Sequence, residues 1–197
     1  MNTQLSRVSL PVWFARGFAR GVLALALAAS TGCTVLDQAT GSPPTAGSDV
    51  TPGAIQWGHR TKTSGCAASG GLPDSACTPG DIIVTATKDV ICVSGYSSTV
   101  RNVTTSEKDA VYAEYGIASH TAGEYEVDHF VSLELGGSND VSNLWPEAAA
   151  PQPGFHEKDK VENYLHDQVC SGQITLADAQ HEIATNWLAV YQQMPGR

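Results

Sequence analysis

The sequence lacks three features that would place it in common functional classes. Basic residues are few: 11 Lys and Arg stand against 20 Asp and Glu, a net charge of −9 that argues against a basic surface coating nucleic acid. No apolar run reaches the ~20 residues that a membrane-spanning helix needs. No internal repeat is visible, so nothing indicates a solenoid or propeller.

What remains is the composition of a globular protein. Hydrophobic residues make up 42% of the 197 positions and charged residues 16%. This length suits one domain with a modest tail.

Residues 1–32 have the pattern of a secretory signal. Residues 1–20 hold three arginines and no acid, residues 21–29 are small or apolar, and small residues then lead to Cys33. Small residues before a cysteine resemble the bacterial lipobox, in which Cys33 would be lipidated; ordinary cleavage within 28–31 is the alternative. We therefore expect an exported protein. It would be an envelope lipoprotein anchored to the membrane by Cys33, in the outer membrane of a Gram-negative cell, or else a secreted protein.

The segment after the signal predicts a linker. Residues 33–55 are rich in Thr, Gly, Ser and Pro and hold few bulky apolar side chains, so they cannot form a core. Loss of residues 1–32 removes three arginines and no acid, which changes the net charge from −9 to −12. We expect one folded domain over residues 56–197.

Besides Cys33, the chain has four cysteines, Cys66, Cys77, Cys92 and Cys170, which predict two disulfides in an exported domain. Three pairings are possible. Because Cys77 and Cys92 flank one expected strand segment, we favour Cys77–Cys92 together with Cys66–Cys170. Zinc binding by these cysteines is the alternative, but their spacing contains no close pair.

Local patterns predict a small mixed α+β domain with little strand. The expected elements are a loop over 57–80, a hairpin of 82–87 and 90–93, a short helix capped by Ser106, a strand over 125–135, and helices over 156–170 and from an N-cap at Thr175.

Residues 124–147, EYEVDHFVSLELGGSNDVSNLWPE, hold the densest group of chemically active side chains. Adjacent strand residues face opposite sides, so Asp128 and His129 can serve one site only from a strand end or a kink. The Gly-Gly turn brings the chain back, and Asn143 follows His129 by 14 residues. This arrangement predicts that an aspartate, a histidine and an asparagine converge.

This run resembles the HNH endonuclease superfamily, in particular a branch of secreted bacterial proteins with D-H, L-E-L-G-G and N-L-W-P at this spacing. The resemblance covers about residues 124–170. It implies a disulfide-stapled domain in which two β-strands and a helix hold one divalent metal ion, followed by C-terminal helices. It also implies hydrolysis of nucleic-acid phosphodiester bonds, with DNA as a non-specific substrate.

The resemblance assigns a role to each of three residues. His129 matches the general base that takes a proton from the attacking water. Asp128 matches a metal ligand, and its hard carboxylate suits Mg²⁺ best, with Mn²⁺ or Zn²⁺ as alternatives. Asn143 matches the central asparagine, which holds the loop that carries the base.

The expected third metal ligand is missing. The family places His or Asn about nine residues after the central asparagine, where this chain has Gln152. We expect His156 to replace it, with rival positions further along the same helix at His166, Asp159 and Glu162.

Two basic residues, Lys158 and Arg101, are weak candidates for phosphate contacts. A solvated helix charge is the alternative for Lys158, and a buried hydrogen-bonded pair is the alternative for Asp128 with His129. Three functions stay open: a metal-dependent nuclease, an inactive HNH-like lipoprotein that acts as a binding or structural module, and a hydrolase of other phosphodiesters. The acidic charge and the missing ligand favour the second, and no pattern indicates a protein partner.

Overall fold

The computed structural model describes residues 55–197, which lie in one compact unit, Ser48–Arg197. The predicted signal at 1–32, Cys33, and the linker up to residue 54 lie outside the described residues. Among the helices that are described, none combines the length and apolar character needed to cross a membrane.

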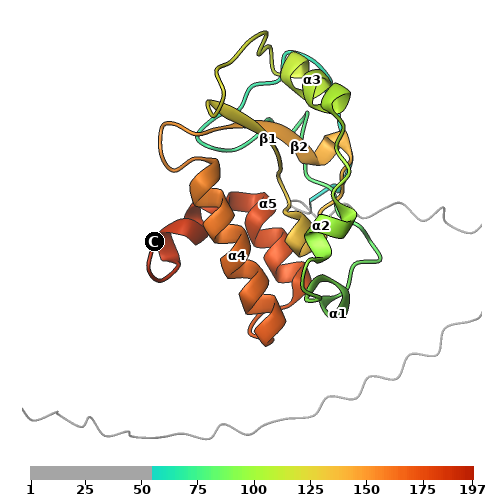
Figure 1. Cartoon of the computed structure of the whole chain (residues 1–197), viewed down its shortest axis with the longest axis vertical. Helices are drawn as coiled ribbons and strands as arrows, with labels where there is room; N and C mark the ends of the chain where they lie inside the picture. The colour runs from blue at the N-terminus through green and yellow to red at the C-terminus, as the bar shows by residue number, and fades with distance from the viewer. Residues whose placement is uncertain (1–54) are drawn as a thin grey trace, which may run out of the picture. The chain divides into compact units, whose positions relative to one another are not determined.

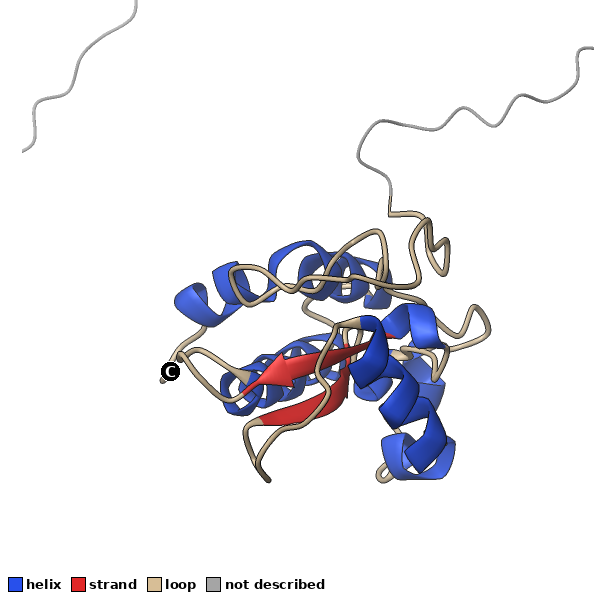
Figure 2. Cartoon of the chain, turned by 90° about the horizontal axis from the view of Figure 1, so that it is seen from above, coloured by secondary structure: helices blue, strands red, loops and turns tan. Residues whose placement is uncertain are grey.

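Two strands pair in an antiparallel sheet, β1 (Tyr125–His129) and β2 (Leu144–Ala148). Figure 2 shows them lying side by side. The last residue of β1, His129, is opposite Leu144, the first residue of β2. Together with the helices, this sheet confirms the predicted mixed α+β class. Asp128 and His129 are the last two residues of β1.

The strand predicted over 125–135 is only five residues long, because the chain turns directly after β1. Two 3-10 turns, η1 (Leu133–Leu135) and η2 (Val141–Asn143), lie between the strands. The first of the two glycines in between, Gly136, has φ of +73°. A Cβ on the second, Gly137, would lie 1.8 Å from the carbonyl oxygen of Val131, so this turn requires glycine.

Both predicted C-terminal helices are confirmed, as α4 (Phe155–Ser171) and α5 (Leu176–Gln193). They pack against each other beside the sheet (Figure 1). The predicted N-cap, Thr175, accepts a hydrogen bond from the backbone N–H of Asp178. Within α5 the helix is interrupted at Asn186, whose φ is −166° and whose side-chain oxygen accepts from the N–H of Ala189.

The core lies between these two helices, the sheet and η1. It is formed by buried apolar side chains from these four parts and from the segment directly after β1, among them Phe130, Val131, Leu135, Trp145, Val161, Leu165, Val169, Ala179, Ile183 and Trp187. The helix α3 (Thr105–Glu114) packs against both strands. Its cap is Thr104 rather than the predicted Ser106, because Thr104 and Glu107 form a reciprocal capping box.

The predicted hairpin is wrong. Its second half forms a short helix, α1 (Lys88–Ile91), which is followed by α2 (Tyr96–Val100). A hairpin on a core buries alternate side chains, but Val84 and Val93 are 88% and 61% exposed. Ile91 is buried, but on α1 rather than on a strand, and the exposed valines lack the packed surface that would favour a strand.

The favoured disulfide pairing is also wrong. The bonds join Cys66 to Cys77 and Cys92 to Cys170, with Cα–Cα distances of 6.1 and 5.7 Å. The pairing of Cys77 with Cys92 was expected from a hairpin that does not form. Cys92 instead ties the end of α1 to α4, and the other bond closes a loop within the irregular N-terminal part.

Candidate active site

His129, at the end of β1, is 2% exposed. Its Nε2 lies 3.1 Å from the side-chain oxygen of Asn139. That oxygen also accepts from the backbone N–H of Asn102 at 3.1 Å, while the Asn139 amide nitrogen donates to the carbonyl of Val100 at 2.8 Å. Because the Asn139 oxygen is an acceptor, Nε2 of His129 carries the proton and Nδ1 has the lone pair.

The surroundings of His129 favour the neutral imidazole. Burial lowers its pKa most, and the charges of Arg101 and Lys158 lower it further. The charge of Asp128 and the bond to Asn139 raise the pKa, but the net shift is downward. At neutral pH the ring is therefore uncharged, which is the form that can accept a proton.

Asn143 is fully buried and uses its side chain entirely on the backbone. Its oxygen accepts from the N–H of Val131 at 2.8 Å and from that of Asp81 at 3.3 Å. Its amide nitrogen donates to the carbonyls of Val131 and Ser138 at 3.0 and 2.8 Å. These contacts fix the loop between β1 and β2, which carries Asn139 and so sets the position of the His129 ring.

On the other face of β1, the ammonium of Lys158 lies against Asp128. Its Nζ donates to Oδ2 of Asp128 at 2.6 Å, to the carbonyl of His129 at 2.8 Å and to the carboxylate of Glu162. An ammonium has three N–H donors, so all are used. The side chain of Lys158 is 0% exposed. Its interpretation as a solvated helix charge is wrong, and it has no exposed surface for a phosphate.

Two further carboxyl groups lie beside this ion pair. Burial raises the pKa of Glu162 to about 7, although Lys158 and a 2.8 Å bond from Ser132 oppose that shift. Among the described residues, no N–H or hydroxyl group bonds the buried carboxyl of Glu147; its neighbour is the carboxyl of Asp128. Burial, together with the charge of Asp128, raises the pKa of Glu147 to about 10, so this carboxyl is protonated at neutral pH.

The residues around Asp128 do not fit a bound divalent ion. The Lys158 ammonium already takes Oδ2 of Asp128 and a carboxylate oxygen of Glu162. His156 is exposed on the first turn of α4, with its ring against Phe155 at a centroid distance of 4.2 Å. Asp128 and His156 therefore do not converge with a third ligand in the described part of the chain.

One group could hold a metal ion. Within residues 55–197, the only three potential ligand atoms from His, Cys, Asp or Glu that all lie within 4.8 Å of one another belong to Cys92, His166 and Cys170. Cys92 and Cys170 form a disulfide, however, and metals bind the thiolate. Of the rival third ligands, His166 is thus in this group, Glu162 is paired with Lys158, and Asp159 is exposed.

Sequence reasoning missed Asn139, Glu147 and the partners of Lys158. Asn139 lies in a turn, where asparagine is common for conformational reasons alone. Strand alternation could have found Glu147, because it is opposite Glu126 and so shares the face of Asp128. Arg101 is exposed just after α2, close enough to His129 for its charge to lower the pKa of the imidazole.

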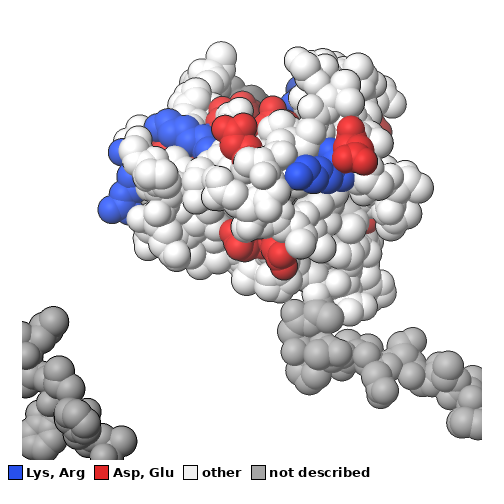
Figure 3. Space-filling model, turned by 90° about the horizontal axis from the view of Figure 1, so that it is seen from below, with Lys and Arg blue, Asp and Glu red and all other residues white. Residues whose placement is uncertain are grey.

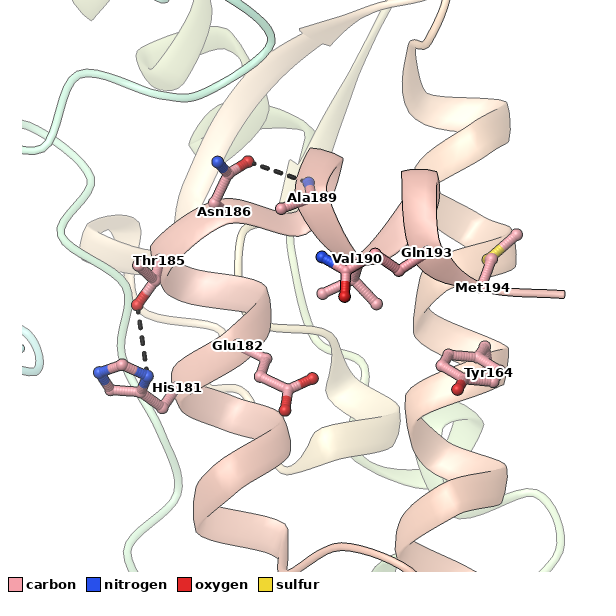
Figure 4. Close-up of a pocket in the computed structure, with 9 residues that line it drawn as sticks. All are labelled: Tyr164, His181, Glu182, Thr185, Asn186, Ala189, Val190, Gln193 and Met194. Carbon is pink, nitrogen blue, oxygen red and sulfur yellow. Dashed lines mark hydrogen bonds between the residues drawn. The ribbon is translucent and has the colours of Figure 1, made fainter. Parts of the chain in front are cut away.

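On the face shown in Figure 3, the basic residues are separated by neutral and acidic ones. A cavity of about 390 Å³ lies between α4 and the interrupted α5 (Figure 4). Its walls include Tyr164, His181 and Glu182 but none of the motif residues.

The His129 ring and the Asp128 ion pair therefore form the candidate site on geometry alone. Comparisons of the chain with protein-family models, curated proteins and solved structures find no match.

Proposed function

We propose that the chain is an exported phosphodiester hydrolase of the HNH type, acting on nucleic acid and chiefly on DNA. The observation that carries the proposal is the state of His129. The ring is neutral, Asn139 fixes the proton on Nε2, and the lone pair is on Nδ1. A general base needs this combination of a fixed tautomer and an unprotonated nitrogen at neutral pH.

The mechanism uses residues on both sides of the ring. Nδ1 of His129 takes a proton from the water that attacks the phosphorus atom. The bond from phosphorus to the 3′ oxygen breaks, and this oxygen takes a proton from solvent, which leaves a 5′-phosphate and a 3′-hydroxyl. The contacts of Asn143 keep the loop beside the ring in place. Arg101 is an exposed cation whose charge acts on the His129 ring, and its guanidinium is suited to a phosphate oxygen. The sequence adds an expectation of Mg²⁺ on Asp128 and His156, but we assign no step to it because these residues do not fit the ion.

Export belongs to the same proposal and rests on residues 1–32 and Cys33. If Cys33 carries the lipid, the protein sediments with membranes, and the Cys33→Ala variant moves to the soluble fraction. A variant that stays with the membrane would count against the lipid anchor.

The decisive test uses the exported protein, with both disulfides formed, on supercoiled plasmid in Mg²⁺, Mn²⁺, Zn²⁺ and EDTA. We expect nicking that His129→Ala abolishes and that His156→Ala, an exposed histidine of α4, retains. Nicking that persists in the His129 variant would assign the activity elsewhere or to a contaminant. A bis-aryl phosphodiester tested in parallel shows whether small esters are preferred over DNA.

One observation favours a second function, in which an inactive HNH-like scaffold acts as a binding or structural module. All three donors of Lys158 are used within the protein, and His129 is only 2% exposed. Well-folded protein that binds DNA without cutting it under any condition would support this alternative.

A further inference from the structure

Three oxygen atoms from two elements converge on one point beside the candidate base. Asp128 and the carbonyl of His129 come from the end of β1, and Glu162 comes from α4. Asp128 and Glu162 have side chains only 13% and 14% exposed. A buried group of carboxylates with a carbonyl is the donor set of a cation site. The cation that occupies it is the ammonium of Lys158.

The helix supplies both this cation and one of its partners. Lys158 and Glu162 are four residues apart, so they lie on the same face of α4. They pair directly with each other, without a bridging water molecule or a group from another loop. An ion of the size of Mg²⁺ requires six oxygens at ~2.0–2.1 Å, and the ammonium would have to leave Asp128 before such an ion could bind.

We propose that Lys158 is the built-in cation of this site, that it replaces a divalent metal on Asp128, and that the folded protein therefore binds no divalent ion there. Lys158 is a positioning residue, because its contact with the candidate base is the hydrogen bond to the backbone carbonyl of His129. The consequence for catalysis rests on the proposed function: cleavage by His129 continues in EDTA.

Metal binding tests this inference without reference to activity. Binding of Mn²⁺ is measured by electron paramagnetic resonance, and thermal unfolding is followed with and without Mg²⁺ or Mn²⁺. For the unaltered protein we expect no binding below millimolar Mn²⁺ and no change in Tm. For Lys158→Ala, which leaves Asp128 and Glu162 without their cation, we expect Mn²⁺ affinity at least tenfold higher and a Tm that rises with the ion.

Two controls separate this site from ordinary surface charge. Lys160→Ala removes a lysine that is 3.4 Å from Glu157 and half exposed, and we expect it to behave as the unaltered protein does. Adding Asp128→Asn to Lys158→Ala should abolish the new affinity, because the main ligand is lost.

The inference is overturned if the unaltered protein binds Mn²⁺ at micromolar concentration and Asp128→Asn removes that binding. This arm needs no lysine variant, so it decides the matter even if Lys158→Ala does not fold. Cleavage that stops in EDTA and returns with Mg²⁺ would also overturn it. Cleavage absent under every condition refutes the proposed hydrolase, whereas the absence of metal binding would still support the cation role of Lys158.

Discussion

Asp128 and His129 are neighbours in β1, yet their side chains lie in two different environments. On the α4 side, Asp128 is in an ionic group closed by Lys158. On the loop side, the neutral ring of His129 is held by the amide of Asn139. One peptide unit therefore separates a charged cluster from an uncharged base, and strand alternation is what keeps them apart.

The two sides are joined through the backbone. Lys158 donates to the carbonyl of His129, so the charged side also fixes the position of the residue on the neutral side. The charges of Asp128 and Lys158 act on the pKa of His129 in opposite directions. Because these two charges oppose each other, burial is the main influence on the pKa of the His129 ring.

The largest expected effect comes from removing the cation on the charged side. Lys158→Met leaves buried carboxylates without a counter-charge, and we expect the free energy of unfolding to fall by about 3–5 kcal/mol in urea titrations. Lys160→Met is the matched control on the same helix, where the lysine is half exposed and a change below about 0.5 kcal/mol is expected. Equal losses in the free energy of unfolding for the two variants would contradict a special role of the buried lysine.

On the neutral side, the largest effect is expected from Asn143→Ala. The variant leaves buried N–H and carbonyl groups of Val131 and Ser138 without partners, so we expect a loss of about 2–4 kcal/mol. Asn163→Ala is the control, because Asn163 is exposed and makes only a local bond within α4. A small loss at both positions would show that the loop does not depend on Asn143.

The protonation of Glu147 makes the stability of the charged side depend on pH, and this dependence can be measured. With a pKa of about 10 in the folded state and an ordinary value of 4.5, folded protein binds more protons than unfolded protein between these values. The free energy of unfolding therefore falls as pH rises through that range. The glutamine of Glu147→Gln has no proton to lose. At pH 9 the free energy of unfolding of this variant should therefore be about 1–3 kcal/mol higher than that of the unaltered protein, with a smaller difference at pH 5.

The matched control for this pH series is Glu182→Gln, an exposed carboxyl on α5. Parallel pH profiles for the unaltered protein and Glu147→Gln would mean that Glu147 is not the group responsible.

The smallest effect on stability is expected from Asn139→Ala, which removes the partner of the ring. Asn139→Ala removes the bond to the ring and the two bonds to backbone groups of Asn102 and Val100. Asn102 is exposed and Asn139 only partly buried, so water can replace these partners, and we expect a cost of about 1 kcal/mol. The bond to Asn139 raises the pKa of His129, so its loss should lower that pKa further. Nitrogen chemical shifts of the imidazole should show a mixture of tautomers instead of the Nε2–H form. An unchanged tautomer would assign the orientation of His129 to packing alone.

The parts that the sequence predicted correctly depend on local signals. The apolar spacing of α4 and α5 and the cap at Thr175 lie within single segments, so they could be recognised without knowing their partners. The hairpin prediction failed because β-branched residues favour strands only on a packed surface, and Val84, Val90 and Val93 are exposed. The incorrect disulfide pairing followed from that same error.

The candidate site was only partly predicted, because some of its contacts are local in sequence and others depend on tertiary packing. The motif located Asp128, His129 and Asn143, and the structure places all three at one strand end. The environment of Lys158 depends on β1, which lies 29 to 30 residues earlier in the chain. A lysine within an acidic helical segment is typical of a solvated surface, and only the tertiary contact shows that it is buried.

The two disulfides also differ in when they can form as the chain is made. Cys66 and Cys77 are 11 residues apart, so this ring can close soon after its second cysteine emerges. Cys92 must wait for Cys170, 78 residues later, and the ring that they close encloses β1, β2, His129 and Lys158. Because a chain emerges from its N-terminus, the segment with the candidate chemistry is covalently enclosed only after residue 170 has emerged.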